Sequence, residues 1–160
     1  MRKSLVVAAA WFLGSNPAAT WAQHPAPAMT AERLVQHLQR VGTDVQVDRN
    51  VVEFTYQGTR GACIYDVSHD RMRIVAPIIE DSLVSNAQRR VMMEANFDRA
   101  LDARYATQGG VLYAVFIHPL SPLTEVELTQ GIQQVAALQQ NFGASYSSGA
   151  LMFGAPAEPQ

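Results

Sequence analysis

Apolar residues recur at two spacings along this chain, every second residue in some segments and every third or fourth in others. The first spacing is typical of strands with one buried face, and the second is typical of amphipathic helices. In chain order the pattern predicts α-β-β-β-α-β-β-α. We therefore expect a two-layer α+β fold, in which three helices pack against an antiparallel sheet of about five strands.

The first helix is expected just after Thr30, whose side chain suits the position that caps a helix. Four apolar residues follow at the spacing of one helical face: Leu34, Val35, Leu38 and Val41. Gly42 then stands where helices commonly end. This segment is predicted to be a short amphipathic helix that covers the sheet.

Four runs of alternating apolar and polar residues come next. Their apolar members are Val45 and Val47; Val52, Phe54 and Tyr56; Cys63, Tyr65 and Val67; and Met72, Ile74, Ala76 and Ile78. Turns are expected at Arg49-Asn50, between Gly58 and Gly61, and at Ser68-His69-Asp70. Pro77 has no amide donor, so the last run is predicted to end there or to lie at a sheet edge. The alternation indicates three or four antiparallel strands with one face toward a core.

A second helix is predicted from Ser85 to Ala100. Ser85 and Gln88 form a capping box, and the apolar side of the helix carries Val84, Ala87, Val91, Met92 and Ala95. The segment from Leu101 to Tyr105 then alternates as a strand does. Gly109-Gly110 after it is typical of a hairpin turn.

The segment from Val111 to Ile117 is apolar on both faces, which favours a central strand. Thr124 and Glu127 form a second capping box, at the start of a helix that runs to Phe142. Its apolar face carries Leu128, Ile132, Val135 and Phe142. Gly131 weakens this helix by about 1 kcal/mol relative to alanine, so we expect a close backbone approach to the sheet there.

The chain begins with the pattern of a secretory signal peptide. Arg2 and Lys3 precede an apolar run, Leu5 to Leu13, and Thr20-Trp21-Ala22 supplies a small–x–small ending. The run is shorter than the roughly 20 residues that span a bilayer, and an uncleaved anchor is the alternative. We expect cleavage after Ala22, which makes residues 1–22 a signal peptide, 23–29 a flexible leader, 30–142 a single α+β domain and 143–160 a mobile C-terminal tail. The mature protein is then periplasmic or secreted and has no membrane span.

Charged residues exclude several functions. The whole chain has a net charge of −2, and loss of Arg2 and Lys3 leaves ten arginines and no lysine against 14 acidic residues, a net charge of −4. Without lysine there is no Schiff base and no phosphate-loop lysine. Because the largest basic cluster is Arg89-Arg90, no nucleic-acid partner is expected. Cys63 is the only cysteine and is interpreted as a buried, unreactive strand residue.

Three groups of residues suggest catalysis. Ser68-His69-Asp70 contains the residue types of a hydrolase triad, but triad members converge from separate elements, so we interpret it as a polar turn. Paired carboxylates occur at Glu80-Asp81, which precedes a helix where acids are favourable. A second pair, Asp98 and Asp102, lies among arginines and indicates an ion-pair patch. No catalytic residue is predicted.

Metal binding has two hints. The histidines His24, His37, His69 and His118 have no second His or Cys at ligand spacing, so no zinc site is predicted. Cleavage after Trp21 instead of Ala22 creates an amino-terminal Ala22-Gln23-His24 triplet, which suits copper. The methionines are the second hint, although such positions usually hold core residues; they are Met29, Met72, Met92, Met93 and Met152. No cofactor is predicted.

The run Met93-Glu94-Ala95-Asn96-Phe97-Asp98-Arg99-Ala100 is followed by a short strand, a glycine turn, Val111-Leu112-Tyr113-Ala114-Val115 and a helix from Thr124. This order resembles the YbjN-type family of bacterial sensory-transduction regulators, which is similar in fold to type III secretion chaperones. The resemblance covers about residues 30–142 and places Asn96 where both groups have an asparagine. It implies a secretion-chaperone-like fold. Secretion chaperones work in the cytoplasm, whereas the predicted signal peptide exports this chain. No type III effector client is therefore expected.

Two classes of function follow. The leading hypothesis is an exported, non-enzymatic protein-interaction module, chaperone-like and regulatory, because helices on one sheet face leave the other face and an edge strand for a second copy or an extended peptide. The predicted partner-binding residues are Val52, Phe54, Tyr56 and Tyr65, unless that aromatic face is core. The alternative is a small periplasmic ligand or copper carrier, and an enzyme comes third.

Overall fold

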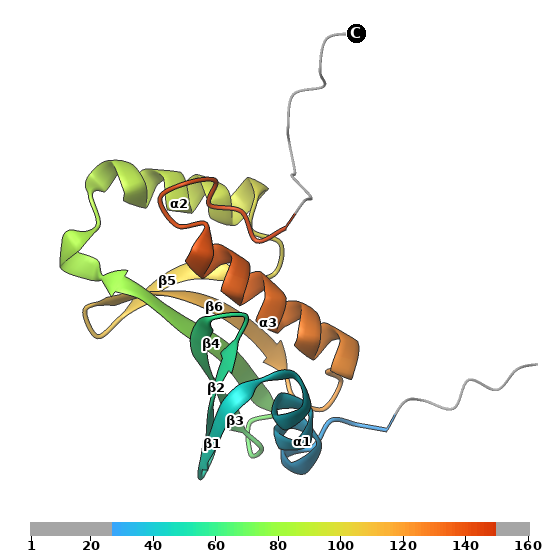
Figure 1. Cartoon of the computed structure of the whole chain (residues 1–160). Coiled ribbons are helices and arrows are strands. Elements are labelled where there is room, and N and C mark those ends of the chain that lie inside the picture. The colour runs from blue at the N-terminus through green and yellow to red at the C-terminus, as the bar shows by residue number, and fades with distance from the viewer. Residues whose placement is uncertain (1–26, 150–160) are drawn as a thin grey trace, which may run out of the picture.

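The computed structural model describes residues 27–149 and shows helices packed on a six-stranded sheet (Figure 1). The helices are α1 (Ala31–Val41), α2 (Asn86–Asp98) and α3 (Glu125–Gln140), with a single 3-10 turn, η1 (Asp81–Leu83). The strands are β1 (Thr43–Asp48), β2 (Val51–Tyr56), β3 (Thr59–Asp66), β4 (Arg71–Glu80), β5 (Arg104–Gln108) and β6 (Val111–Pro119). The predicted signal peptide with its cleavage site, most of the leader and the end of the predicted tail lie outside the described residues.

The sheet is antiparallel throughout, with the strand order β1-β2-β3-β4-β6-β5. The predicted α+β class is therefore confirmed, and β6 is a central strand as its apolar faces indicated. The strand count is six instead of about five, because the residues of β1 form a strand of their own. Four strands, and not three, precede α2.

The predicted helix starts are confirmed. Thr30 caps α1 by accepting a hydrogen bond from the Arg33 amide. Ser85 with Gln88, and Thr124 with Glu127, form complete capping boxes, in which the cap side chain and the third helical residue satisfy each other's backbone amides. Gly109 and Gly110 have φ angles of 58° and 77°, which a two-residue hairpin turn requires.

Two predictions about strand breakers are wrong. Pro77 neither ends β4 nor lies at an edge, because β4 continues to Glu80 between β3 and β6. An irregularity in the ladder between Pro77 and Ile79 accommodates the missing amide donor. Gly61 belongs to β3 and not to a turn; a Cβ there would lie 2.9 Å from the Val75 carbonyl oxygen, so the strands approach too closely for a side chain.

The predicted strand from Leu101 is also too long. Leu101 to Ala103 form a loop, and β5 begins at Arg104. The cause is Gln134 of α3, whose side-chain oxygen accepts hydrogen bonds from the amides of Asp102 and Ala103 at 2.8 and 3.0 Å. These amides bond to a helix and not to a neighbouring strand.

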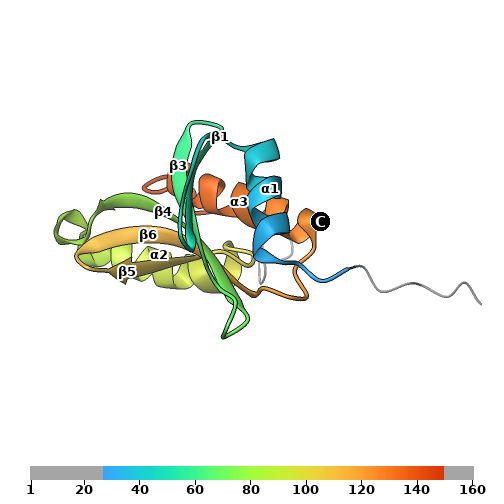
Figure 2. The same ribbon diagram turned by 90° about the horizontal axis from the view of Figure 1, so that it is seen from below.

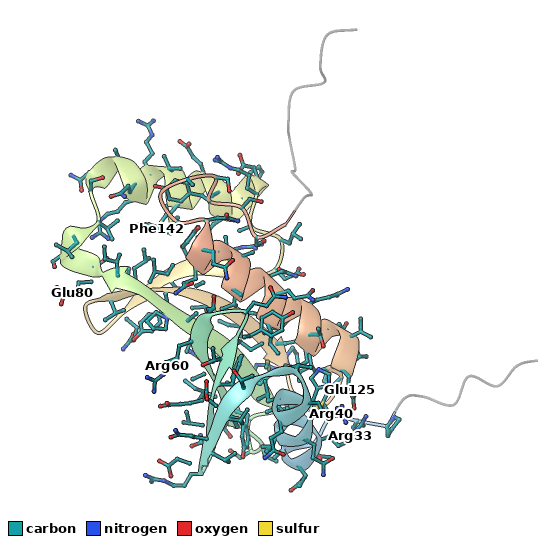
Figure 3. All side chains as sticks on the ribbon, in the orientation of Figure 1. Arg33, Arg40, Arg60, Glu80, Glu125 and Phe142 are labelled. Atoms are coloured by element: carbon teal, nitrogen blue, oxygen red, sulfur yellow. The ribbon has the colours of Figure 1, made fainter. Side chains whose placement is uncertain are left out.

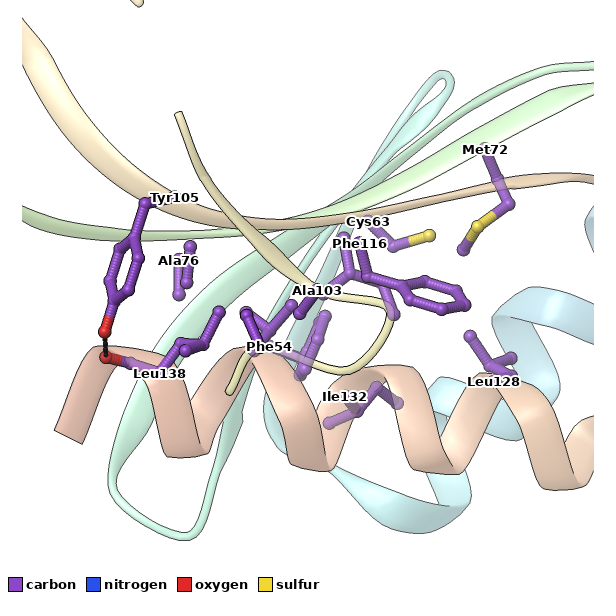
Figure 4. Packing of buried hydrophobic residues seen from close by; sticks show 14 of the residues in the cluster. Phe54, Cys63, Met72, Ala76, Ala103, Tyr105, Phe116, Leu128, Ile132 and Leu138 are labelled. Atoms are coloured by element: carbon purple, nitrogen blue, oxygen red, sulfur yellow. Dashed lines mark hydrogen bonds between the residues drawn. The ribbon is translucent and has the colours of Figure 1, made fainter. Parts of the chain in front are cut away.

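A single hydrophobic core lies between the sheet and the three helices. The alternate strand residues that face it include Val52, Phe54, Cys63, Met72, Ile74, Ala76, Leu112, Ala114 and Phe116. Helix α3 crosses this face diagonally, with α1 beside one end and α2 beside the other (Figures 1 and 2). We call this the inner face of the sheet. The Tyr105 hydroxyl reaches across the core and donates to the Leu138 carbonyl at 3.0 Å (Figure 4).

The folded domain extends beyond both predicted boundaries. Met29 is buried, and its amide donates to the Ser121 carbonyl oxygen. At the other end, Tyr146 packs edge-on against Tyr105 and Phe142 and is 7% exposed. The first residues of the predicted C-terminal tail therefore belong to the domain. Within residues 27–149, no helix has the length and apolar character needed to span a membrane.

Gly131 sets the distance between α3 and the sheet. A Cβ at this position would lie 2.7–2.9 Å from three atoms of the Phe116 ring, including Cγ, the ring atom that is bonded to Cβ. The ring is itself buried and cannot move aside freely. The predicted close approach at this glycine is therefore confirmed.

We predict that Gly131→Ala destabilises the protein. Alanine improves helix propensity by about 1 kcal/mol, but the overpacked ring costs about 1–3 kcal/mol. The net loss should appear as a lower midpoint of urea unfolding. In a Phe116→Leu background the same substitution should be neutral or stabilising, and a higher midpoint for Gly131→Ala alone would contradict the account.

Candidate functional site

The turn after β3 does not form a catalytic triad. Ser68 Oγ donates to Asp66 at 2.6 Å, and His69 Nδ1 lies 2.6 Å from the same carboxylate. These hydrogen bonds lower the pKa of Asp66 to about 2. The imidazole nitrogen nearest Ser68 is the one that faces Asp66, so it is not free to take the serine proton. Asp70 binds Ser121 instead, and the interpretation as a polar turn is confirmed.

Cys63 is fully buried in β3, and burial raises the pKa of its thiol to about 12. The thiolate needed for nucleophilic attack is therefore absent near neutral pH. The predicted unreactive cysteine agrees with this environment.

His37 joins α1 to α3. Its Nδ1 lies 3.0 Å from Arg40 and 3.3 Å from the Glu125 carboxylate, its Nε2 faces Thr129 at 2.8 Å, and Thr129 in turn donates to the Glu125 carbonyl oxygen. Arg40 also binds the Glu125 carboxylate at 2.7 Å, with Arg33 close by (Figure 3). Desolvation works to raise the pKa of Glu125, but the charge of Arg40 and the bond from His37 outweigh it and lower that pKa. The recorded contacts between His37, Arg40, Thr129 and Glu125 hold the two helices together.

Among residues 27–149, no three His, Cys, Asp or Glu side chains come together as a metal site. His118 stacks on Phe116, and its Nδ1 lies 2.7 Å from the Pro119 carbonyl oxygen. His24, with the amino-terminal copper triplet, lies outside the described residues. Met29, Met72 and Met92 are core residues, whereas Met93 is 69% exposed.

The two carboxylate pairs do not combine into acid–base sites. Asp81 binds Arg89 at 2.7 Å, and Asp98 binds Arg99 at 2.8 Å. Asp102 accepts a hydrogen bond from Gln134. Asp81, Asp98 and Asp102 therefore bind nearby side chains that stabilise the local structure.

The predicted partner-binding residues all lie on the inner face. Val52 and Phe54 are in the core beneath the helices, as the alternative interpretation held. Tyr56 and Tyr65 are half-buried at its margin, where the Tyr56 hydroxyl accepts from Gln133 and the Tyr65 hydroxyl donates to the Arg49 carbonyl. Contact of the two tyrosines with a partner stays a prediction, and the open face of the sheet is the opposite one.

Asn96 protects one edge of the sheet. Its side-chain oxygen accepts from the Tyr105 amide at 2.8 Å, and its side-chain nitrogen donates to the Tyr105 carbonyl at 3.2 Å. In this way one amide side chain replaces a neighbouring strand along β5. In an antiparallel edge strand, the backbone N–H and C=O groups of every second residue point away from the neighbouring strand. Within β5, Thr107 is therefore the one remaining residue whose backbone N–H and C=O face the open edge. The asparagine singled out by the family resemblance thus has a structural role.

The opposite edge is also protected. In β1 the ladder is irregular between Thr43 and Gln46, and Asp44 has a positive φ of 53°. Asp48 adds a second exposed charge. Irregular pairing and charged side chains both oppose the addition of another strand. The edge-strand part of the sequence-based hypothesis is therefore less favoured than its open-face part.

An apolar groove runs along the outer face of the sheet, the face away from the helices. It has a volume of about 320 Å³. We call this depression the outer groove; its apolar lining consists of Ile64, Val75, Ala106, Tyr113, Val115 and Ile117. Ile117 is 57% exposed. Sequence reasoning missed these residues, although the apolar character of both faces of β6 was the available signal.

Comparison with solved structures supports the fold. A chain of the HopA1–SchA chaperone–effector complex matches with a TM-score of 0.54 and 8% identity, over 68% of this chain and 88% of that chain. A chain of the ExsC–ExsE complex matches with a TM-score of 0.49 and 13% identity, over 68% and 90%. No family model matches the sequence, and no curated protein does. The match to a chain of the HopA1–SchA complex confirms the secretion-chaperone-like fold, while membership of the YbjN-type family stays a prediction.

We predict that Cys63 reacts with a thiol reagent only after unfolding. The thiol has an ordinary pKa of 9.0 and a folded pKa of about 12, so its stabilising contribution is complete below pH 9 and is lost as the pH rises toward 12. The free energy of unfolding should fall more steeply over this range than in Cys63→Ala, by up to about 1.4 kcal/mol per pH unit. Rapid labelling of the folded protein would show the opposite, an accessible thiol.

Proposed function

We propose that this protein is a non-enzymatic protein-binding module that holds a partner protein on the outer face of its sheet. The observation that carries the proposal is the outer groove, where apolar side chains of four neighbouring strands lie open to solvent. Contiguous exposed apolar surface of this kind commonly marks an interaction site. The fold shared with a chain of a chaperone–effector complex supports the same class of function.

The place and purpose of this binding rest on the sequence. The predicted signal peptide places the mature protein in the periplasm or outside the cell. A regulatory role follows from the resemblance to the YbjN-type family. In this proposal, the clients are proteins of the cell envelope and not type III effectors.

A second surface favours self-association. Met93 and Phe97 lie one turn apart on α2 and are 69% and 81% exposed. Residues four apart project from the same side of a helix, so these two side chains form one apolar patch. We propose that two copies of the chain form a homodimer through this patch, which leaves the outer groove available to a partner.

Photo-crosslinking tests the partner site. With p-benzoylphenylalanine in place of Ile117, irradiation of cells of the native host should yield a distinct adduct with another protein. The matched control is the same replacement at Val126, which is 65% exposed on the outside of α3. The proposal fails if position 117 gives no adduct or if both positions give the same adducts.

The homodimer is tested on purified protein. Light scattering at micromolar concentration should give twice the mass of the chain, and Phe97→Glu should reduce it to one chain because the charge cannot be buried in the interface. Val126→Glu, a charge at another exposed apolar position, should leave the dimer intact. A strictly monomeric wild-type protein contradicts the homodimer.

A further inference from the structure

Some arginines of the domain are paired with a carboxylate and others are not. Ten arginines lie within residues 27–149, and seven of them have a carboxylate within 4 Å. The three that have no such carboxylate in this part of the chain are Arg71, Arg73 and Arg104. All three belong to strands. Arg71 and Arg73 occupy outward-facing positions of β4, whereas Arg104 folds back on the loop before β5 and lines a hollow with Gln130 and Gln134 of α3. Two of the three charges without a carboxylate therefore lie on the outer face.

Arg73 is the central member of this set. In the sheet register it lies between Ile64 on β3 and Ile117 on β6, two residues of the outer groove. It also lines the groove itself. Among the described residues it has no recorded hydrogen-bond partner. A guanidinium with free donors thus stands in the middle of an apolar surface.

The other two arginines lie outside the groove. Arg104 lies opposite Val115, and its guanidinium donates to the carbonyls of Ala100, Leu101 and Ala103. Arg71 lies two residues from Arg73 on the same side of β4 and donates to the Asp70 carbonyl at 3.1 Å. Because carbonyl oxygens carry no net charge, both side chains keep an uncompensated charge.

Two acids of the same face near Arg73 are already engaged, and Glu80 lies at the far end of β4, opposite Val111. Glu53 binds Arg60 at 2.9 Å, and Arg60 points away from α1 and α3 (Figure 3). Asp66 is held by Ser68 and His69. A second copy of the chain laid on this face would bring Arg71 and Arg73 of both copies onto one interface, and like charges across an interface are unfavourable. The charge pattern therefore favours a different occupant.

We propose that the outer groove recognises an acidic segment of the partner protein, in which carboxylates alternate with apolar side chains. The apolar side chains cover Ile64, Val115 and Ile117, and the carboxylates accept hydrogen bonds from Arg73. An arginine guanidinium matches the two oxygens of a carboxylate, and the contact is strong where the surroundings are apolar. This inference rests on the proposed function and names the chemistry of the partner at the same site.

Peptide selection tests this chemistry. The purified protein is immobilised and panned against phage-displayed random dodecapeptides, and the enriched sequences should contain Asp or Glu alternating with apolar residues. Fluorescence anisotropy of an enriched peptide should then show binding about tenfold weaker or more for Arg73→Gln, since hydrogen bonds to charged groups are among the stronger ones. Higher salt should weaken binding to the wild type more than binding to the variant.

The matched control is Arg90→Gln, which removes an exposed arginine of α2 that binds Glu94 at 3.5 Å. This variant should bind the peptide as the wild type does. Thermal unfolding of both variants confirms that they are folded, because Arg73 is exposed and carries no core contact.

The outcomes separate the inference from the proposed function. Enrichment of neutral or basic peptides, or unchanged binding by Arg73→Gln, overturns the acidic segment but leaves a protein-binding module. Arginine-dependent binding to phosphatidylglycerol vesicles in place of peptides also overturns it, in favour of an anionic membrane. Failure to enrich any peptide overturns the inference, and together with missing adducts from position 117 it removes the proposed function.

Discussion

The packing of α3 on the sheet determines how the rest of the molecule is arranged. The bare backbone at Gly131 lies against the Phe116 ring, and this contact brings the whole helix close to the central strands. With α1 and α2 on the same side, one hydrophobic cluster contains buried apolar residues from all three helices. Strand residues alternate between faces, so covering one face leaves the next residue of every strand on the open face. The exposed outer face is a direct consequence of this one-sided cover.

Much of the fold could be predicted from local signals. The capping boxes, the Gly109-Gly110 turn and the central position of β6 depend on residues close together in the sequence, and each was confirmed. Features that depend on distant partners were missed. Pro77 is tolerated through an irregular pairing with β6, and the loop before β5 is set by Gln134, which lies more than thirty residues away.

The candidate site could be predicted only in outline. Alternation of apolar and polar residues shows that the sheet has two faces, but it does not say which face the helices cover. The aromatic residues Phe54 and Tyr56 therefore suggested that their face binds a partner, whereas the helices cover it. The outer face became visible only when Ile64, Arg73 and Ile117 were placed side by side by the strand register. Pairing of arginines likewise depends on tertiary contacts that no sequence spacing reveals.

Edge protection and the open face support the same account of binding. Asn96 occupies one edge of the sheet, and the irregular, charged strand β1 forms the other. A partner is therefore expected to lie on the face of the sheet and to be recognised by side chains more than by backbone pairing. Apolar contact and the charge of Arg73 act together in this arrangement.

The most direct test is a methyl NMR titration of the protein with a bound partner segment. The account predicts that chemical shifts change at Ile64, Val75, Val115 and Ile117, while the methyl groups of Leu34, Leu128 and Ile132 beneath the helices stay unchanged. Shifts confined to the helical side, with an unperturbed outer face, would contradict the central claim.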